Sequence, residues 1–189
     1  MALVASPYGF ALRYNPSGQS RAKAYAILPA YTTAIGFGDG VILDTNGSIT
    51  VGTAANDLIG VFAGCEYVDP TGKPNVSKNW PGTAGCTNIV AWVHDDPNNV
   101  YEGQFAISAT TVLQAAIGDQ VDLVAGTPNA LTGQSAQSFN ATLKGAGVQG
   151  QFRILGVGVD GFYDALANPF PTALVQIARH QFLVAKTAI

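Results

Sequence analysis

The chain has 189 residues, of which 48% are hydrophobic and only 11% are charged, and its net charge is −3. This length suits one domain with a substantial core, and the hydrophobic content excludes a disordered chain. The charged fraction lies well below the roughly 25% of ordinary soluble proteins, which indicates a surface that is either covered by neighbouring subunits or polar through Thr, Ser, Asn and Gln.

Residues 1–22 are predicted to form an extended N-terminal arm. Prolines and glycines interrupt any helix there, and the large apolar residues alternate with a period of two: Tyr8, Phe10, Leu12 and Tyr14. Such a segment can pair with a sheet edge in the same chain or in another. The bases of residues 1–38 are too sparse for a nucleic-acid arm but would suit an acidic protein surface: Arg13, Arg21 and Lys23.

Residues 23–189 are predicted to form one β domain. Short β-like segments follow one another at 24–28, 41–44, 48–51, 58–68, 89–94, 100–107, 121–124, 139–143, 152–159, 173–179 and 182–185. Thr45-Asn46-Gly47 predicts a hairpin turn, and 69–88 reads as a long turn-rich excursion typical of contact loops. One helical turn is expected at 110–116. This pattern predicts an all-β sandwich or barrel.

No constellation of residues in the sequence indicates catalysis, so we expect a protein that is not an enzyme and has no cofactor. Two G-x-G-x-x-G stretches, at 145–150 and 156–161, lack the following helix and acid of a dinucleotide site. His94-Asp95-Asp96 has no metal-ligand spacing around it and reads as a turn. Cys65 and Cys86 are expected to be buried thiols, although a bond between them stays open.

The two tryptophans receive different interpretations. Trp92 lies in an apolar strand and is expected in the core. Trp80 lies in the 69–88 loop beside Pro81-Gly82, where it is either a contact anchor or a side chain folded back over the core. No apolar run is long enough for a transmembrane helix, and the first residues lack a secretory signal, so we expect neither membrane nor nucleic-acid partners.

Several short motifs, in their order along the chain, resemble capsid decoration (cement) proteins of tailed phages, including cyanophage-like podoviruses and myoviruses. They lie mainly within residues 7–107: Pro7-Tyr8-Gly9-Phe10, Gly38-Asp39-Gly40-Val41, Ile59-Gly60-Val61-Phe62-Ala63-Gly64-Cys65-Glu66-Tyr67, Asn79-Trp80-Pro81-Gly82 and Ala91-Trp92-Val93-His94-Asp95-Asp96-Pro97. A weaker echo follows at Phe152-Arg153-Ile154-Leu155-Gly156.

The resemblance implies a structural virion protein on the outer capsid surface, assembled in the host cytoplasm. It would bind the phage major capsid protein, associate as a homotrimer and clamp neighbouring capsid subunits. The implied fold is a single-domain jelly-roll-like β-sandwich, or alternatively the smaller lambda-type β fold. The residues expected to contact the capsid are Tyr8, Phe10, Arg13, Tyr14 and Trp80.

Two other functions remain open from the sequence. The first is a tail or head-fibre structural module, which would associate with the tail or form a different oligomer. The second is a carbohydrate-binding β-sandwich, in which three aromatic side chains would form a stacking platform: Trp80, Tyr67 and Tyr101.

Overall fold

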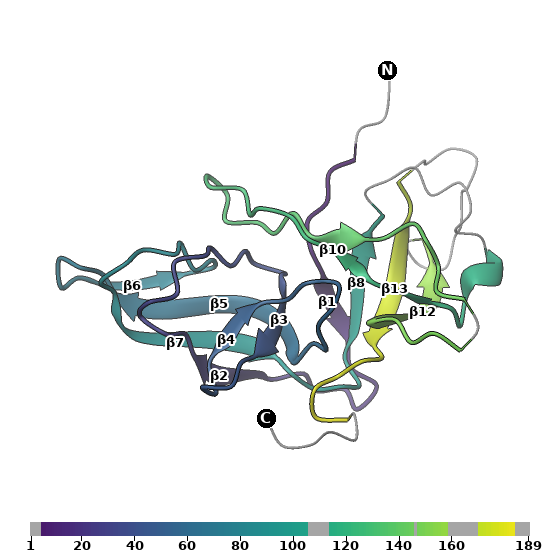
Figure 1. Cartoon of the computed structure of the whole chain (residues 1–189), viewed down its shortest axis with the longest axis horizontal. Helices are drawn as coiled ribbons and strands as arrows, with labels where there is room; N and C mark the ends of the chain where they lie inside the picture. The colour runs from purple at the N-terminus through teal and green to yellow at the C-terminus, as the bar shows by residue number, and fades with distance from the viewer. Residues whose placement is uncertain (1–4, 106–113, 146, 159–169, 184–189) are drawn as a thin grey trace.

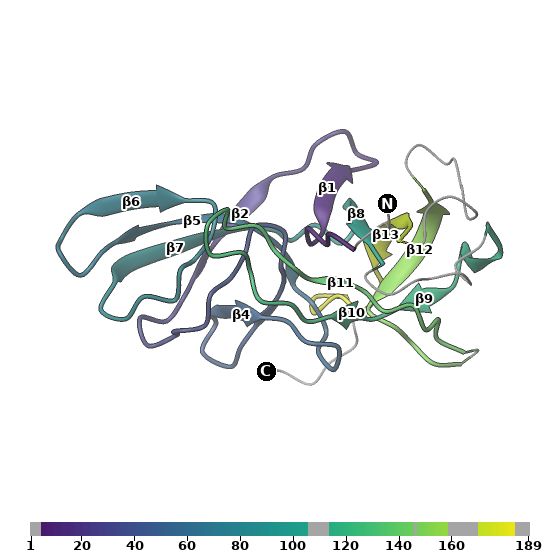
Figure 2. The same ribbon diagram turned by 90° about the horizontal axis from the view of Figure 1, so that it is seen from above.

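The computed structural model describes residues 5–105, 114–145, 147–158 and 170–183, and within them the fold is all-β apart from one short 3-10 turn at Gln114–Ala116. Figure 1 shows two main antiparallel sheets that lie at opposite ends of the long axis. Figure 2 shows the same two sheets from above, with a small ribbon of β10 and β11 below the second sheet.

The first sheet has six strands in the order β2-β7-β5-β3-β4, with β6 paired to β5. Its strands are β2 (Ala22–Ala26), β3 (Gly40–Leu43), β4 (Ile49–Val51), β5 (Gly60–Val68), β6 (Pro74–Ser77) and β7 (Thr87–His94). The second sheet has five strands in the order β1-β8-β13-β12-β9. They are β1 (Ala11–Tyr14), β8 (Val100–Gln104), β9 (Gln120–Val121), β12 (Phe152–Val157) and β13 (Thr172–Ile177).

The six-stranded sheet buries one face beneath two connecting segments. Phe62 of β5 and Val93 of β7 point into this core, and Ile35 and Trp80 cover them from the segments before β3 and before β7. Ile35 and Trp80 exchange two backbone hydrogen bonds of 2.9 Å, which join the two covering segments. The sheet and its cover therefore form a core of their own.

The five-stranded sheet buries its inner face against the ribbon of β10 (Leu123–Val124) and β11 (Ser138–Phe139). Phe139 contacts Phe10 and Phe152, with ring centroids 5.1 and 5.4 Å away. Layers packed on an apolar sheet face are the usual way to build a β core. The structure thus confirms the all-β class and sandwich-type layering, and the described strands form open sheets rather than a closed barrel.

Turn chemistry explains the local connections. Asp44 accepts hydrogen bonds from the backbone N–H groups of Asn46 and Ser48, and Gly47 supplies a positive φ of 74°, so the predicted β3–β4 hairpin is confirmed. Asp69 accepts the N–H groups of Thr71 and Lys73 and turns the chain from β5 into β6.

Some predicted elements differ from the structure. The loop predicted at 69–88 contains β6, and the strand predicted at 121–124 is divided into β9 and β10 at the buried Asp122. Of the strand predicted at 182–185, Phe182 and Leu183 lie in a turn and the rest falls outside the described residues. The helical turn predicted at 110–116 is described only at 114–116, where a 3-10 turn occurs.

The N-terminal segment joins the second sheet at Ala11–Tyr14. β1 pairs antiparallel with β8 of the same chain, and Phe10 donates its backbone N–H to Gly38 O at 2.8 Å. Of the two pairings that an extended arm allows, the structure shows the one within the chain. The division into an arm at 1–22 and one domain at 23–189 stays a prediction.

A buried polar network joins the two halves of the molecule around Asp39. Its carboxylate accepts the N–H of Gly36 at 2.6 Å and the hydroxyl of Ser135 at 2.5 Å. Gln137 donates its N–H to Ser135 Oγ and accepts the N–H of Gly40 at 2.7 Å. The segment before β3 is thereby fixed to the segment before β11.

Burial raises the pKa of Asp39 from 3.8 to about 6. Between these values the folded chain holds a proton that the unfolded chain has lost, so stability falls as the pH rises from about 4 to about 6. We expect Asp39 to contribute a loss of up to about 3 kcal/mol over this range, at about 1.4 kcal/mol per pKa unit. Asp39→Asn, which keeps a neutral side chain, removes that slope in urea unfolding measured from pH 4 to pH 7.

Asp119→Asn serves as the matched control, because Asp119 is exposed in a turn. Its pH profile should parallel that of the unmodified chain. If Asp39→Asn also followed the unmodified profile, the buried carboxyl would not be the source of the pH dependence.

Candidate assembly surfaces

Three of the predicted contact residues lie on the outer side of the five-stranded sheet, around Glu102. Glu102 accepts the phenol hydroxyl of Tyr8 at 2.6 Å and the Nε of Arg13 at 2.8 Å. Burial and this carboxylate raise the pKa of the Tyr8 hydroxyl. Tyr14 is 51% exposed and, with Arg13, Glu102 and Leu174, lines a surface pocket of about 230 Å³. These polar groups are already satisfied within the chain, while the Tyr14 ring remains open to a partner.

The prediction that Phe10 and Trp80 contact a partner is corrected by the structure, because both side chains fill the chain's own cores. Phe10 is 1% exposed and stacks against Phe139 and Phe152. Trp80 is fully buried, donates its indole N–H to Tyr31 O at 3.1 Å and meets Tyr67 edge-on at 5.4 Å. For Trp80, the structure shows the alternative in which the loop folds back over the core.

The aromatic platform of the carbohydrate-binding alternative is not formed on the surface. Trp80 lies in the core of the six-stranded sheet, here called the first core, and Tyr101 lies in the core of the five-stranded sheet, the second core; both side chains are fully buried. Tyr101 donates its hydroxyl to His94 O at 2.8 Å between β7 and β8. A glycan would find neither ring accessible for stacking.

The outward face of the six-stranded sheet is a surface that the sequence did not predict. Directly opposed residues of neighbouring strands share a face, so the pairing register identifies its members. One row crosses β2, β7, β5 and β6 through Ala26, Val90, Glu66 and Val76. A second row joins Ala24, Trp92 and Gly64. We call the residues of these two rows the outward face.

Apart from Glu66 the outward face is apolar, and most of its side chains are at least partly exposed. Val76 is 86% exposed, and Ala24 and Ala26 are also exposed. Trp92, expected in the core, is only half-buried and donates its indole N–H to Glu66 at 3.3 Å. One row further along the same face, His94 pairs with Val61, which is buried in the second core. The second half of the molecule thus covers that end of the face and leaves the Trp92 end uncovered.

A signal for this face was present in the sequence. Residues 89–93 of β7 are apolar at every position, a pattern typical of strands buried on both faces. In this chain Ala91 and Val93 are buried, whereas Val90 and Trp92 on the opposite face are not. Within the part of the chain that the structure describes, only one of the two apolar faces is therefore covered.

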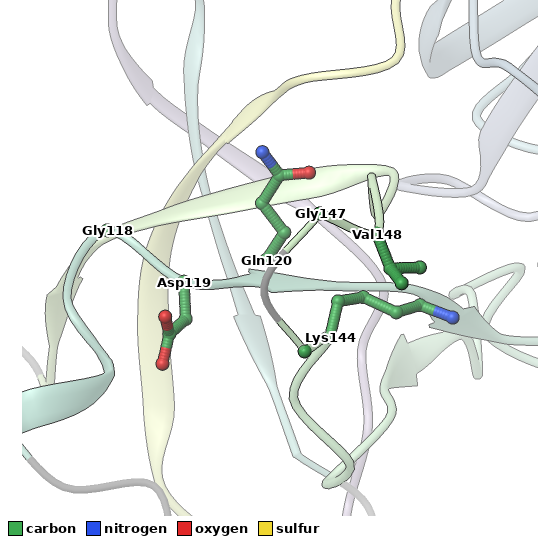
Figure 3. Close-up of a pocket in the computed structure, with 7 residues that line it drawn as sticks. Gly118, Asp119, Gln120, Lys144, Gly147 and Val148 are labelled. Carbon is green, nitrogen blue, oxygen red and sulfur yellow. The ribbon is translucent and has the colours of Figure 1, made fainter.

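The loop that carries the first glycine motif forms a shallow pocket of about 240 Å³, shown in Figure 3. Asp119 and Lys144 point in different directions there, and Lys144 forms an ion pair with Asp122. The side-chain oxygen of Gln120 accepts the N–H of Gly150 at 2.7 Å. Strand β12 follows the loop, so these glycines shape a turn. The second motif lies partly outside the described residues.

The cysteines and histidines are all at least partly buried, and the two cysteines lie in the core of the six-stranded sheet. Cys65 and Cys86 are buried free thiols, and burial raises the pKa of Cys65 to about 12. Burial also lowers the pKa of His94 and of His180. Over the described part of the chain, no group of three or more histidine, cysteine or acidic side chains is arranged to hold a metal ion.

Comparisons with known proteins give no relative for this chain: no protein-family model, curated protein or solved structure matches it. In the described ranges, no helix has the length and apolar character needed to cross a bilayer.

The different burial of Trp80 and Tyr14 predicts a large effect on stability for one and almost none for the other. Trp80→Ala leaves a cavity in the first core and removes the indole N–H that the backbone oxygen of Tyr31 accepts. We therefore expect the free energy of unfolding to fall by about 3–5 kcal/mol. Tyr14→Ala removes an exposed ring, and we expect a change within about 0.5 kcal/mol. Denaturant unfolding of both variants checks this. An unchanged midpoint for Trp80→Ala would contradict its place in the core.

Proposed function

We propose that this protein is a structural virion protein that binds the outside of a tailed-phage capsid and stabilises contacts between major capsid subunits. The observation that carries the proposal is the open, apolar outward face around Trp92 in a chain with only 11% charged residues. Contiguous exposed apolar surface is unusual on proteins that work alone, and interface centres are depleted in charge.

Stabilising contacts between neighbouring subunits requires at least two contact surfaces on each copy. The outward face supplies one of them. The second is the Tyr14 surface, by which we mean the pocket on the five-stranded sheet that Tyr14 lines with Arg13, Glu102 and Leu174. Its strand β1 lies near the middle of the molecule in Figure 1, on a different sheet from the outward face. A protein that touches two subunits resists their separation even when each contact is modest, because the second contact forms at a high effective concentration.

The proposal includes self-association as a homotrimer and a location on the outer surface of the virion. Each interface of standard size would bury roughly 800 Å² per partner. Repetition over the capsid lattice would convert such interfaces into strong binding overall.

Binding to phage heads tests the proposed function directly. We expect the purified protein to co-sediment saturably with expanded heads stripped of their decoration protein and to raise the temperature at which they rupture. Heads that retain their decoration protein are the control, because their sites are occupied. No binding to well-formed stripped heads would contradict the proposal.

The Tyr14 surface has its own test in the same assay. We expect Tyr14→Ala to keep the stability of the free protein but to lose part of the gain in rupture temperature, because one of two subunit contacts is weakened. Leu155→Ala, which removes an exposed apolar side chain from β12, is the matched control. An equal gain for both variants would remove Tyr14 from the proposed contacts.

A further inference from the structure

We propose that Glu66 determines which partner the outward face accepts: a flat apolar surface that presents one basic side chain opposite this carboxylate. The inference rests on the proposed function, so the partner is the major capsid protein. It adds a specificity-determining residue and states the chemistry of the surface that the residue recognises.

Glu66 occupies an interior position of the outward face. In the row that crosses four strands, Val90 of β7 lies on one side of it and Val76 of β6 on the other. Among the strand positions of both rows, Glu66 carries the only formal charge. A partner that covers the apolar residues on both sides of Glu66 must also cover its carboxylate.

The carboxylate is oriented by its neighbour but has no counter-ion in the described part of the chain. Trp92 donates its indole N–H to Oε1 of Glu66 at 3.3 Å, which holds the carboxylate beside the ring. The ion pairs found in that part involve other acids, namely Glu102, Asp95, Asp122 and Asp57. Glu66 is exposed and hydrated in the free protein.

Removing this carboxylate from water is unfavourable unless the partner supplies a compensating charge. A buried carboxylate without a partner is strongly destabilising, whereas an Arg or Lys opposite it forms a charge-assisted hydrogen bond. The apolar residues therefore provide the contact area, and Glu66 rejects apolar surfaces that lack a base. The net charge of −3 also favours a partner with a basic patch.

The same carboxylate disfavours packing of two copies through this face. A symmetric dimer places the same patch of both copies in contact around a two-fold axis. Both copies of Glu66 would then be desolvated against a face whose two rows contain no basic strand position, and near the two-fold axis the two carboxylates would also repel each other. We therefore assign the face to a different chain.

Substitutions at Glu66 and Val76 test the inference in the head-binding assay. Glu66→Lys places like charges in contact, and we expect affinity for stripped heads to fall about tenfold or more. Val76→Lys places an ammonium on the direct cross-strand partner of Glu66, which neutralises the carboxylate within the chain, and we expect a similar loss. Val76→Ala leaves Glu66 unpaired and should bind nearly as well as the unmodified protein.

Two further variants show whether a loss of binding comes from the charge at Glu66, from a general change of net charge or from lost contact area. Asp119→Lys makes the same change of charge in an exposed turn on the other half of the molecule and should bind normally. Trp92→Ala removes the ring that orients Glu66, and we expect about a tenfold loss or more. Because Val76 is 86% exposed, Val76→Lys is expected to fold even if Trp92→Ala does not.

The outcomes distinguish the inference from the function on which it rests. Weaker binding by Glu66→Lys and Val76→Lys, with normal binding by Asp119→Lys and Val76→Ala, supports the inference. If the unmodified protein binds heads and both lysine variants bind equally well, the inference is overturned while the function stands. If those variants instead change only the oligomeric state, the face joins copies of this chain and the inference is again overturned. If the unmodified protein fails to bind, the function itself falls.

Discussion

The buried carboxyl of Asp39 is a central constraint on the arrangement of the two halves. Each sheet has its own core, joined where Leu58 and Val61 enter the second one, and the polar network between the segments before β3 and before β11 fixes the two halves at the same junction. The N-terminal segment enters the same junction, where Gly9 donates its N–H to Gln137 O. A Cβ on Gly9 would lie 2.5 Å from Gly38 O, so glycine is required at this position. The junction thus directs Phe10 into the second core and β1 to the sheet edge.

Most local elements could be predicted because their signals lie within a few residues. The Asn46-Gly47 turn and the alternation in β12 and β13 are of this kind. The division of the strand at Asp122 could not be predicted, since that residue is stabilised from far along the chain by Lys144 and by the backbone of Gln151. Strand β6 was missed because it pairs only at one edge and begins at a proline.

The exposure of the expected contact residues was predicted less well, because a period of two does not say which side chains of an irregular segment reach the surface. Tyr8, Phe10, Leu12 and Tyr14 would share one face of a regular strand. Gly9 has a φ of 78°, and the pairing register shifts between Leu12 and Tyr14. These two irregularities turn Phe10 and Leu12 toward the second core and leave Tyr14 at the surface. Residue type alone could not reveal either change of direction.

An apolar sheet face that stays open carries a hazard, because similar faces and neighbouring sheet edges can associate without selection. Charge within such a face is one way that proteins limit wrong contacts, at some loss of affinity for the right one. Glu66 fits this role: it lies between Val90 and Val76 and receives a hydrogen bond from Trp92, the largest side chain of the outward face. The apolar area needed for tight binding and the charge needed for selective binding thus lie on the same strands. Replacing Glu66 by an apolar residue would add contact area but remove the charge that makes binding selective.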